Sequence, residues 1–242
     1  MKFAVQLYSL RAMAEREGAE AVFAAVGGAG YDGVEFAGFY GKTPEEIGSL
    51  LKKYKLEAVS AHIAADEVER SLPYIDALGI RYVFIPWVGT EVFSDPARYA
   101  ALLESVKRAK PLLDARGVVF GYHNHAHEYE NGQDFVGRIV KDANLAAELD
   151  VFWVTVAGRD AVAEMKGLAG ALALVHVKEA AASDPVHAPQ PVVGEGAVDM
   201  RGVFAEAAAQ SVPWAVLEVE HYPCPEGEYL QKSLAAMKKL AE

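Results

Sequence analysis

The chain has a single cysteine, an excess of acidic over basic residues, and no apolar run of membrane-spanning length. Cys224 has no partner for an internal disulfide, which predicts a reducing, cytoplasmic location. The 23 Lys and Arg residues against 34 Asp and Glu give a net charge of −11, which disfavours binding to a nucleic-acid backbone. No stretch approaches the roughly 20 apolar residues of a membrane span. The start MKFAVQLYSLR lacks the long apolar region of a signal peptide and is predicted to be a strand.

Linkers and low-complexity tracts are also absent, and short apolar runs alternate with helical patterns along the whole chain. Several predicted helices start at a capping residue, as at Thr43 and Asp95, which precede prolines, and at Asp199. The spacing leaves room for a crossover helix after each strand. The eight candidate strands are 3–8, 33–37, 57–62, 81–87, 117–123, 145–151, 172–178 and 214–220.

Eight such units predict a single (β/α)₈ barrel, the TIM-barrel fold, over residues 1–242. The runs are apolar on both faces, as expected where helices cover the outside of a barrel and side chains fill its inside. The alternative is a doubly wound open sheet, which more often has a glycine-rich phosphate-binding turn after its first strand. Residues 8–13 contain no glycine, and this absence favours the barrel.

Metal-capable side chains follow several of the apolar runs. The segment GYHNHAHEYE, residues 121–130, places three alternating histidines directly after the run at 117–120. Later runs carry Asp150 in AAELDVFW, His176 in ALVHVKE and Glu218 in WAVLEVE. Nitrogen and oxygen donors that converge from successive strand ends suit one divalent metal. Because TIM-barrel active sites lie at the C-terminal ends of the strands, we expect the site there.

Further polar side chains are expected at the same face. Lys178 stands two residues after His176 and therefore points the same way along a strand. The carboxylates of Glu218 and Glu220 also share a face, which is hard to tolerate in a core without a cation. Two residues on earlier strands join the candidates, Glu35 in GVEFAG and His62 in VSAHI. Each has an ordinary alternative, since Glu35 could pair with a basic neighbour and His62 could support the ligands without binding metal.

Aromatic residues lie just beyond two strand ends. Trp87 and Trp153 are candidates for the walls of a sugar-binding pocket, because aromatic rings stack on the apolar faces of sugars. His62 and Glu220 are also predicted to contact the substrate there. The equally weighted alternative is that the two tryptophans plug the barrel.

These residues resemble the xylose isomerase-like barrel family, often called sugar phosphate isomerases/epimerases. The resemblance extends over nearly the whole chain, through QLYSLR, GYDGVEFAG, YHNHAHEYE, LDVFWVTVAG, LVHVKE, VGEGAVD and VLEVEH. That family holds one divalent metal with a Glu, an Asp, a His and a Glu from strands five to eight. The resemblance therefore implies that Asp150, His176 and Glu218 are ligands. At the strand-five position this chain has His123, and Glu128 follows in the loop, so both are candidates for the fourth ligand.

The chemistry that the resemblance implies is metal-dependent isomerisation or epimerisation of a sugar or sugar derivative. An ion that chelates a carbonyl and a neighbouring hydroxyl acidifies the intervening C–H and stabilises an enediolate. Glu218 and the strand-five group, for example Glu128, would share the acid and base roles. If His123 is the ligand instead, candidates for the second role are His125, Lys178 and Glu35. Mn²⁺ is the preferred ion, with Mg²⁺, Zn²⁺ and Co²⁺ as alternatives.

The expected partner is a small sugar or polyol, and self-association into a homo-oligomer is left open. Three other functions compete: a metal-dependent sugar lyase or dehydratase, a zinc-dependent hydrolase of the abasic-site endonuclease type, and a non-catalytic binding barrel. The charge of −11 argues against the nuclease, which must grip a DNA backbone. Metal content separates these classes, since one ion favours sugar chemistry, several zinc ions favour the nuclease, and none favours a binding protein.

Overall fold

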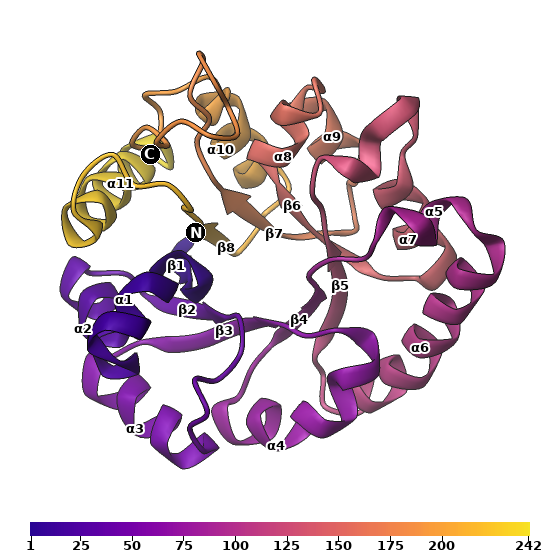
Figure 1. The fold of residues 1–242 in the computed structure, drawn as a ribbon, viewed down its shortest axis with the longest axis horizontal. Helices are drawn as coiled ribbons and strands as arrows, with labels where there is room; N and C mark the ends of the chain where they lie inside the picture. Colours follow the sequence, from indigo (N-terminus) through magenta and orange to yellow (C-terminus); the bar gives the residue numbers. More distant parts are fainter.

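Eight parallel strands pair in chain order, and β8 pairs with β1 to close the ring (Figure 1). The computed structural model describes residues 1–242. The strands are β1 (Lys2–Gln6), β2 (Gly33–Phe36), β3 (Glu57–His62), β4 (Tyr82–Ile85), β5 (Val119–His123), β6 (Ala146–Asp150), β7 (Leu172–Val177) and β8 (Trp214–Leu217). Closure confirms the predicted (β/α)₈ barrel and excludes the open sheet, whose edge strands would remain unpaired.

Helices follow the strands and form the outer ring of Figure 1. The predicted helix starts are confirmed: the Thr43 hydroxyl accepts the N–H of Glu46 in a capping box, and the Asp95 and Asp199 carboxylates also cap helices. No helix combines the length and the apolar character needed to cross a membrane. The helices are α1 (Arg11–Glu17), α2 (Ala19–Ala29), α3 (Pro44–Tyr54), α4 (Val68–Leu78), α5 (Thr90–Ser94), α6 (Pro96–Asp114), α7 (Phe135–Ala143), α8 (Val151–Val156), α9 (Ala161–Gly167), α10 (Met200–Ala209) and α11 (Glu226–Leu240), with 3₁₀ turns η1 (Leu7–Leu10), η2 (Ala65–Glu67) and η3 (His127–Gly132).

Several strands end earlier than their apolar runs predict. β1 stops at Gln6, whose side chain accepts the N–H of Tyr8 and starts a 3₁₀ turn. β4 stops before Pro86, which has no N–H to donate to a neighbouring strand. β8 stops at Leu217, so the predicted strand 214–220 is too long by three residues. Irregular backbone therefore begins where the candidate site residues lie.

Apolar side chains fill the N-terminal half of the barrel interior. The cluster there consists of Ala4, Val59, Phe84, Leu174, Trp214 and Val216. Because side chains alternate along a strand, the residues two positions later also point inward, one layer closer to the C-terminal face. In β1 and β7 these residues are polar, Gln6 and His176, and Glu218 follows in the same way after β8. The apolar layer therefore forms the floor beneath a polar layer.

Candidate metal centre

The polar layer buries an unusual number of ionisable side chains. Glu35, Glu148, Asp150 and His176 have no exposed surface, and His123 is 2% exposed. They come from β2, β5, β6 and β7. Burying charged groups in a barrel is costly unless they pair with one another or with a cation. The layer is therefore the strongest candidate for a functional site.

One group in this layer, called the metal group below, contains Asp150, His176 and Glu218, the three residues that the family resemblance implied as ligands. Donor atoms of His123, Asp150, His176 and Glu218 all lie within 4.8 Å of one another. The Nδ1 atom of His176 lies 3.0 Å from Glu218 Oε2 and 3.8 Å from Asp150 Oδ2. These separations fit atoms that share one ion at metal–ligand distances of about 2.0–2.3 Å.

Asp150 shows why this group suits a cation. Its Oδ1 accepts the N–H of Trp153 at 3.0 Å and caps helix α8, while its backbone is held by the side-chain amide of Asn124. Its Oδ2 is buried and has no hydrogen-bond partner. A buried carboxylate oxygen without a partner is costly, and a metal ion would satisfy it. The donor set and this oxygen therefore fit a divalent metal.

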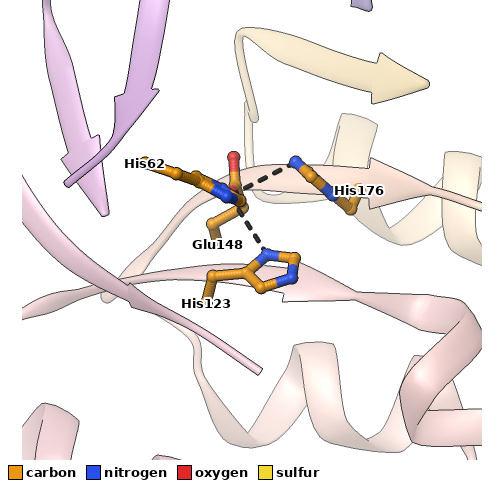
Figure 2. A group of neighbouring side chains, drawn as sticks. All are labelled: His62, His123, Glu148 and His176. Atoms are coloured by element: carbon orange, nitrogen blue, oxygen red, sulfur yellow. Dashed lines mark hydrogen bonds and ion pairs between the residues drawn. The ribbon is translucent and has the colours of Figure 1, made fainter. Parts of the chain in front are cut away.

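A second group, called the lower group below, lies beneath the metal group and shares both of its histidines. Figure 2 shows His62, His123 and His176 converging on the carboxylate of Glu148. Glu148 Oε2 lies 2.7 Å from His62 Nε2, 3.2 Å from His123 Nδ1 and 3.3 Å from His176 Nε2. Glu148 is not among the site residues predicted from the sequence. Its signal was its position two residues before Asp150, which places both carboxylates on the inner face of β6.

Glu35 completes the lower group. Its Oε1 accepts a hydrogen bond from Gln6 Nε2 at 2.7 Å and lies 2.7 Å from His176 Nε2 and 3.1 Å from His62 Nε2. The other oxygen, Oε2, is buried without a partner, as is Oε1 of Glu148. The Gln6 contact gives the first motif of the sequence, QLYSLR, a role in holding the Glu35 carboxylate.

Burial and mutual contact shift the pKa values of these groups in opposite directions. Burial and the neighbouring Glu35 carboxylate raise the pKa of Glu148 to about 8. Burial lowers the pKa of His62, but Glu35 and Glu148 outweigh it and raise the value to about 10. Burial also raises the pKa of Asp150. Burial raises the pKa of Glu218 as well, but Lys178 and His176 outweigh it and lower the value. A bound divalent cation would favour the ionised form of each nearby carboxylate.

The structure does not bring Glu128 into either group of potential ligands. Its carboxylate accepts hydrogen bonds from the Tyr122 hydroxyl at 2.8 Å and from the backbone N–H of His125 at 2.9 Å. His125 lies at the mouth, and burial lowers its pKa to about 3. His127 instead places Nε2 3.0 Å from the Val88 carbonyl. Among the candidates on β5 and in the loop that follows it, His123 is therefore the one that lies beside Asp150, His176 and Glu218.

A cavity of about 580 Å³ opens above the metal group. The four side chains predicted to bind substrate, His62, Trp87, Trp153 and Glu220, all line it, together with His123, His125 and Glu218. Trp87 is 57% exposed and therefore does not plug the barrel. No Lys or Arg is among the lining residues.

Lys178 lies behind the cavity wall rather than on it. Its ammonium group is 3.6 Å from Glu218 Oε1, contacts the Glu220 carboxylate, and sits over the rings of Phe152 and Trp153. Burial lowers the pKa of Lys178, but the surrounding carboxylates outweigh it and raise the value. The carboxylates of Glu218 and Glu220 were expected to need a nearby cation, and Lys178 supplies one.

A sequence model of the xylose isomerase-like TIM barrel matches residues 23–240. The chain belongs to this family. Comparison with curated protein sequences gives no match.

Several solved structures have a similar fold. A sugar phosphate isomerase/epimerase from Parabacteroides distasonis has a TM-score of 0.78 at 17% identity, covering 100% of this chain and 96% of that one. The IOLI protein with a bound zinc atom has a TM-score of 0.74 at 12% identity, covering 100% and 98%. D-allulose 3-epimerase from Methylomonas sp., in complex with D-allulose, has a TM-score of 0.72 at 15% identity, covering 99% and 96%. At these identities the likeness shows the fold of the xylose isomerase-like barrels.

Proposed function

We propose that the protein is a divalent-metal-dependent isomerase or epimerase that transfers a proton next to the carbonyl of a sugar or sugar derivative. The observation that carries the proposal is the convergence of four buried donors beneath an open cavity, with Asp150 Oδ2 left unpaired. Membership of the xylose isomerase-like family supports the reaction class.

The ion would be held by His123, Asp150, His176 and Glu218. We assign the strand-five ligand to His123 because the Glu128 carboxylate already accepts two hydrogen bonds away from the group. When bound, a divalent ion supplies Lewis-acid polarisation of a substrate carbonyl. Two carboxylates with two imidazoles suit Mn²⁺, which we retain as the preferred ion, and also suit Zn²⁺ and Co²⁺ better than Mg²⁺.

The base is assigned to Glu218. It lines the cavity, and nearby Lys178 and His176 keep its pKa low, so the carboxylate is ionised and ready to accept a proton. Among the candidates for the second role, His125 is the one that lines the cavity, while Glu35 and Lys178 are buried behind other side chains. His125 would take part as a neutral imidazole, because burial lowers its pKa.

The cavity favours an uncharged sugar or polyol over a sugar phosphate. It offers carboxylates and imidazoles to hydroxyl groups and indole rings to the apolar face of a sugar, with no Lys or Arg to pair with a phosphate. A lyase or dehydratase would use the same base, and it would differ by expelling a hydroxyl group or an alkoxide after proton removal.

The test is a screen of keto-sugars and polyols with added Mn²⁺, read by NMR in D₂O. We expect deuterium at the carbon next to the carbonyl, loss of activity with a chelator, and recovery when the ion is restored. Glu218→Gln should lower kcat by about 10²–10⁴-fold, the usual contribution of a general base. Glu179→Gln is the control, because it removes a buried carboxylate that lies outside both the metal group and the cavity lining. Full activity in metal-free protein would refute the proposal, and loss of water from the substrate would identify a dehydratase.

A further inference from the structure

Each imidazole in the proposed metal group places one nitrogen against a buried carboxylate that lies outside that group. For His176, Nδ1 faces Glu218 and Asp150, while Nε2 lies 2.7 Å from Glu35 Oε1. A neutral imidazole carries one N–H, and the carboxylate is the group that can accept it. With an ion in the metal group, Glu218 and Asp150 would face the ion, so Glu35 is the carboxylate left to accept that N–H, and Nδ1 of His176 is the nitrogen left for the ion.

His123 shows the same arrangement with its nitrogens exchanged. Its Nδ1 lies 3.2 Å from Glu148 Oε2, and its Nε2 makes no hydrogen bond to the protein. As a metal ligand, His123 would be a neutral ring with a single N–H. If Glu148 accepts that N–H, Nε2 is the nitrogen left free for an ion. In Figure 2 a dashed line joins the His123 ring to the Glu148 carboxylate.

We propose that Glu148 and Glu35 are positioning residues that fix the tautomers of His123 and His176, so that one nitrogen of each ring is free to bind the ion. The proposal rests on the proposed function, because it presumes the metal group above. Metal-bound histidines commonly donate their other N–H to a carboxylate, which orients the ring and strengthens its donor nitrogen. Here two such carboxylates lie side by side, and His62 Nε2 contacts both, at 2.7 Å from Glu148 and 3.1 Å from Glu35.

A second ion in the lower group is the competing explanation. The unpaired oxygens of Glu35 and Glu148 would suit it. However, the two groups share His123 and His176, so two ions would need both nitrogens of each ring and would strip both rings of their protons. Imidazole binds metals as the neutral ring. The shared rings therefore favour one ion above and two hydrogen-bonded carboxylates below.

The experiment compares metal affinity in wild type, Glu148→Gln, Glu35→Gln and the control Glu128→Gln, by competition of Mn²⁺ or Zn²⁺ with a chelator. A glutamine amide can donate to the ring nitrogen and so permits the wrong tautomer. We expect both lower-group variants to bind the ion about 10–100-fold more weakly, with the control unchanged. Thermal unfolding of each metal-free variant checks that the barrel is intact.

Two further readouts separate orientation from a merely structural effect. In ¹⁵N-labelled, zinc-loaded protein, we expect the retained ring protons on Nδ1 of His123 and Nε2 of His176. Metal analysis should give one ion per wild-type chain. Unchanged affinity in Glu148→Gln, or a proton on Nε2 of His123, would overturn the proposal while leaving the proposed function intact. Two ions in wild type and one in Glu148→Gln would replace it with a second metal site. Absence of any bound ion would overturn both proposals together.

Discussion

Without metal, the protein should become less stable as the pH rises from 6.5 to 8, and a bound divalent ion should remove this loss. The reason lies in two contacting residues of the lower group, His62 and Glu148, whose Nε2 and Oε2 atoms lie 2.7 Å apart. Burial first lowers the pKa of His62, but the carboxylates raise it from 6.5 to about 10. Burial and Glu35 raise the pKa of Glu148 from 4.5 to about 8.

The sign of the effect follows from proton binding. The pKa of His62 is higher in the folded state than in the unfolded state. The stability that this difference contributes is fully present below the unfolded pKa of 6.5 and is lost as the pH rises through about 10. The raised pKa of Glu148 acts in the same direction. The folded chain keeps the Glu148 proton up to about pH 8, whereas the unfolded chain releases it above pH 4.5. Between 6.5 and 8 the folded protein therefore holds more protons than the unfolded chain, and rising pH favours unfolding.

Each extra proton held by the folded state changes stability by about 1.4 kcal/mol per pH unit. Because His62 and Glu148 share a hydrogen bond, their protons are coupled, and we take the value for one proton as the expected slope. In a chain of this size about 1 kcal/mol shifts the unfolding temperature by roughly 2–4 °C. The metal-free protein should therefore lose about 3–6 °C per pH unit.

The assay is thermal unfolding of chelator-treated protein across this pH range, repeated with excess Mn²⁺. The ion stabilises ionised carboxylates and binds more tightly as its ligands deprotonate, so the loaded protein should show a flat or rising curve. Glu148→Gln cannot release a proton at this position, and its metal-free curve should be flatter than that of wild type. A metal-free wild-type protein whose unfolding temperature stays level or rises between pH 6.5 and 8 would refute the reasoning.

Two substitutions test the packing around the site. Gly121→Ala should destabilise the barrel by about 1–3 kcal/mol, since the added Cβ would lie 2.5 Å from the Phe84 ring in the apolar floor; an unchanged urea midpoint would show that the floor can give way. Lys178→Met should cost the metal-free protein about 3 kcal/mol, because Glu218 and Glu220 then lose their shared cation. Added Mn²⁺ should recover part of that loss, and equal urea midpoints for variant and wild type would contradict the pairing.

The sequence was sufficient to predict the barrel and most of the metal group, because both depend on local periodicity. Apolar runs of strand length separated by helical patterns identify β1 to β8, and strand alternation places Asp150, His176 and Glu218 on the inner face at one end. The ends of the strands were less predictable. They depend on local hydrogen bonding, such as that of Gln6 with Tyr8, and on the missing N–H of Pro86.

Long-range contacts account for what the sequence did not reveal. Glu148 looks like an ordinary residue of β6 until His62, 86 residues earlier in the chain, is found beside it. The choice between His123 and Glu128 was open for a similar reason. The carboxylate of Glu128 suits a metal, and only the positions of the Tyr122 hydroxyl and the His125 backbone show that it is already engaged.

The histidine at the strand-five position changes where negative charge lies around the proposed ion. A glutamate there would give three carboxylates in direct contact with the metal, whereas His123 leaves two, Asp150 and Glu218. A third carboxylate, that of Glu148, stands behind the imidazole, with its Oε2 3.2 Å from His123 Nδ1. If Glu148 accepts the ring N–H, its charge would reach the ion through the ring, which would become a stronger donor without becoming a base open to substrate. In the proposed reaction this arrangement would leave Glu218 as the one ligand that both touches the cavity and can accept a proton from substrate, and the acid and base roles would be unequal.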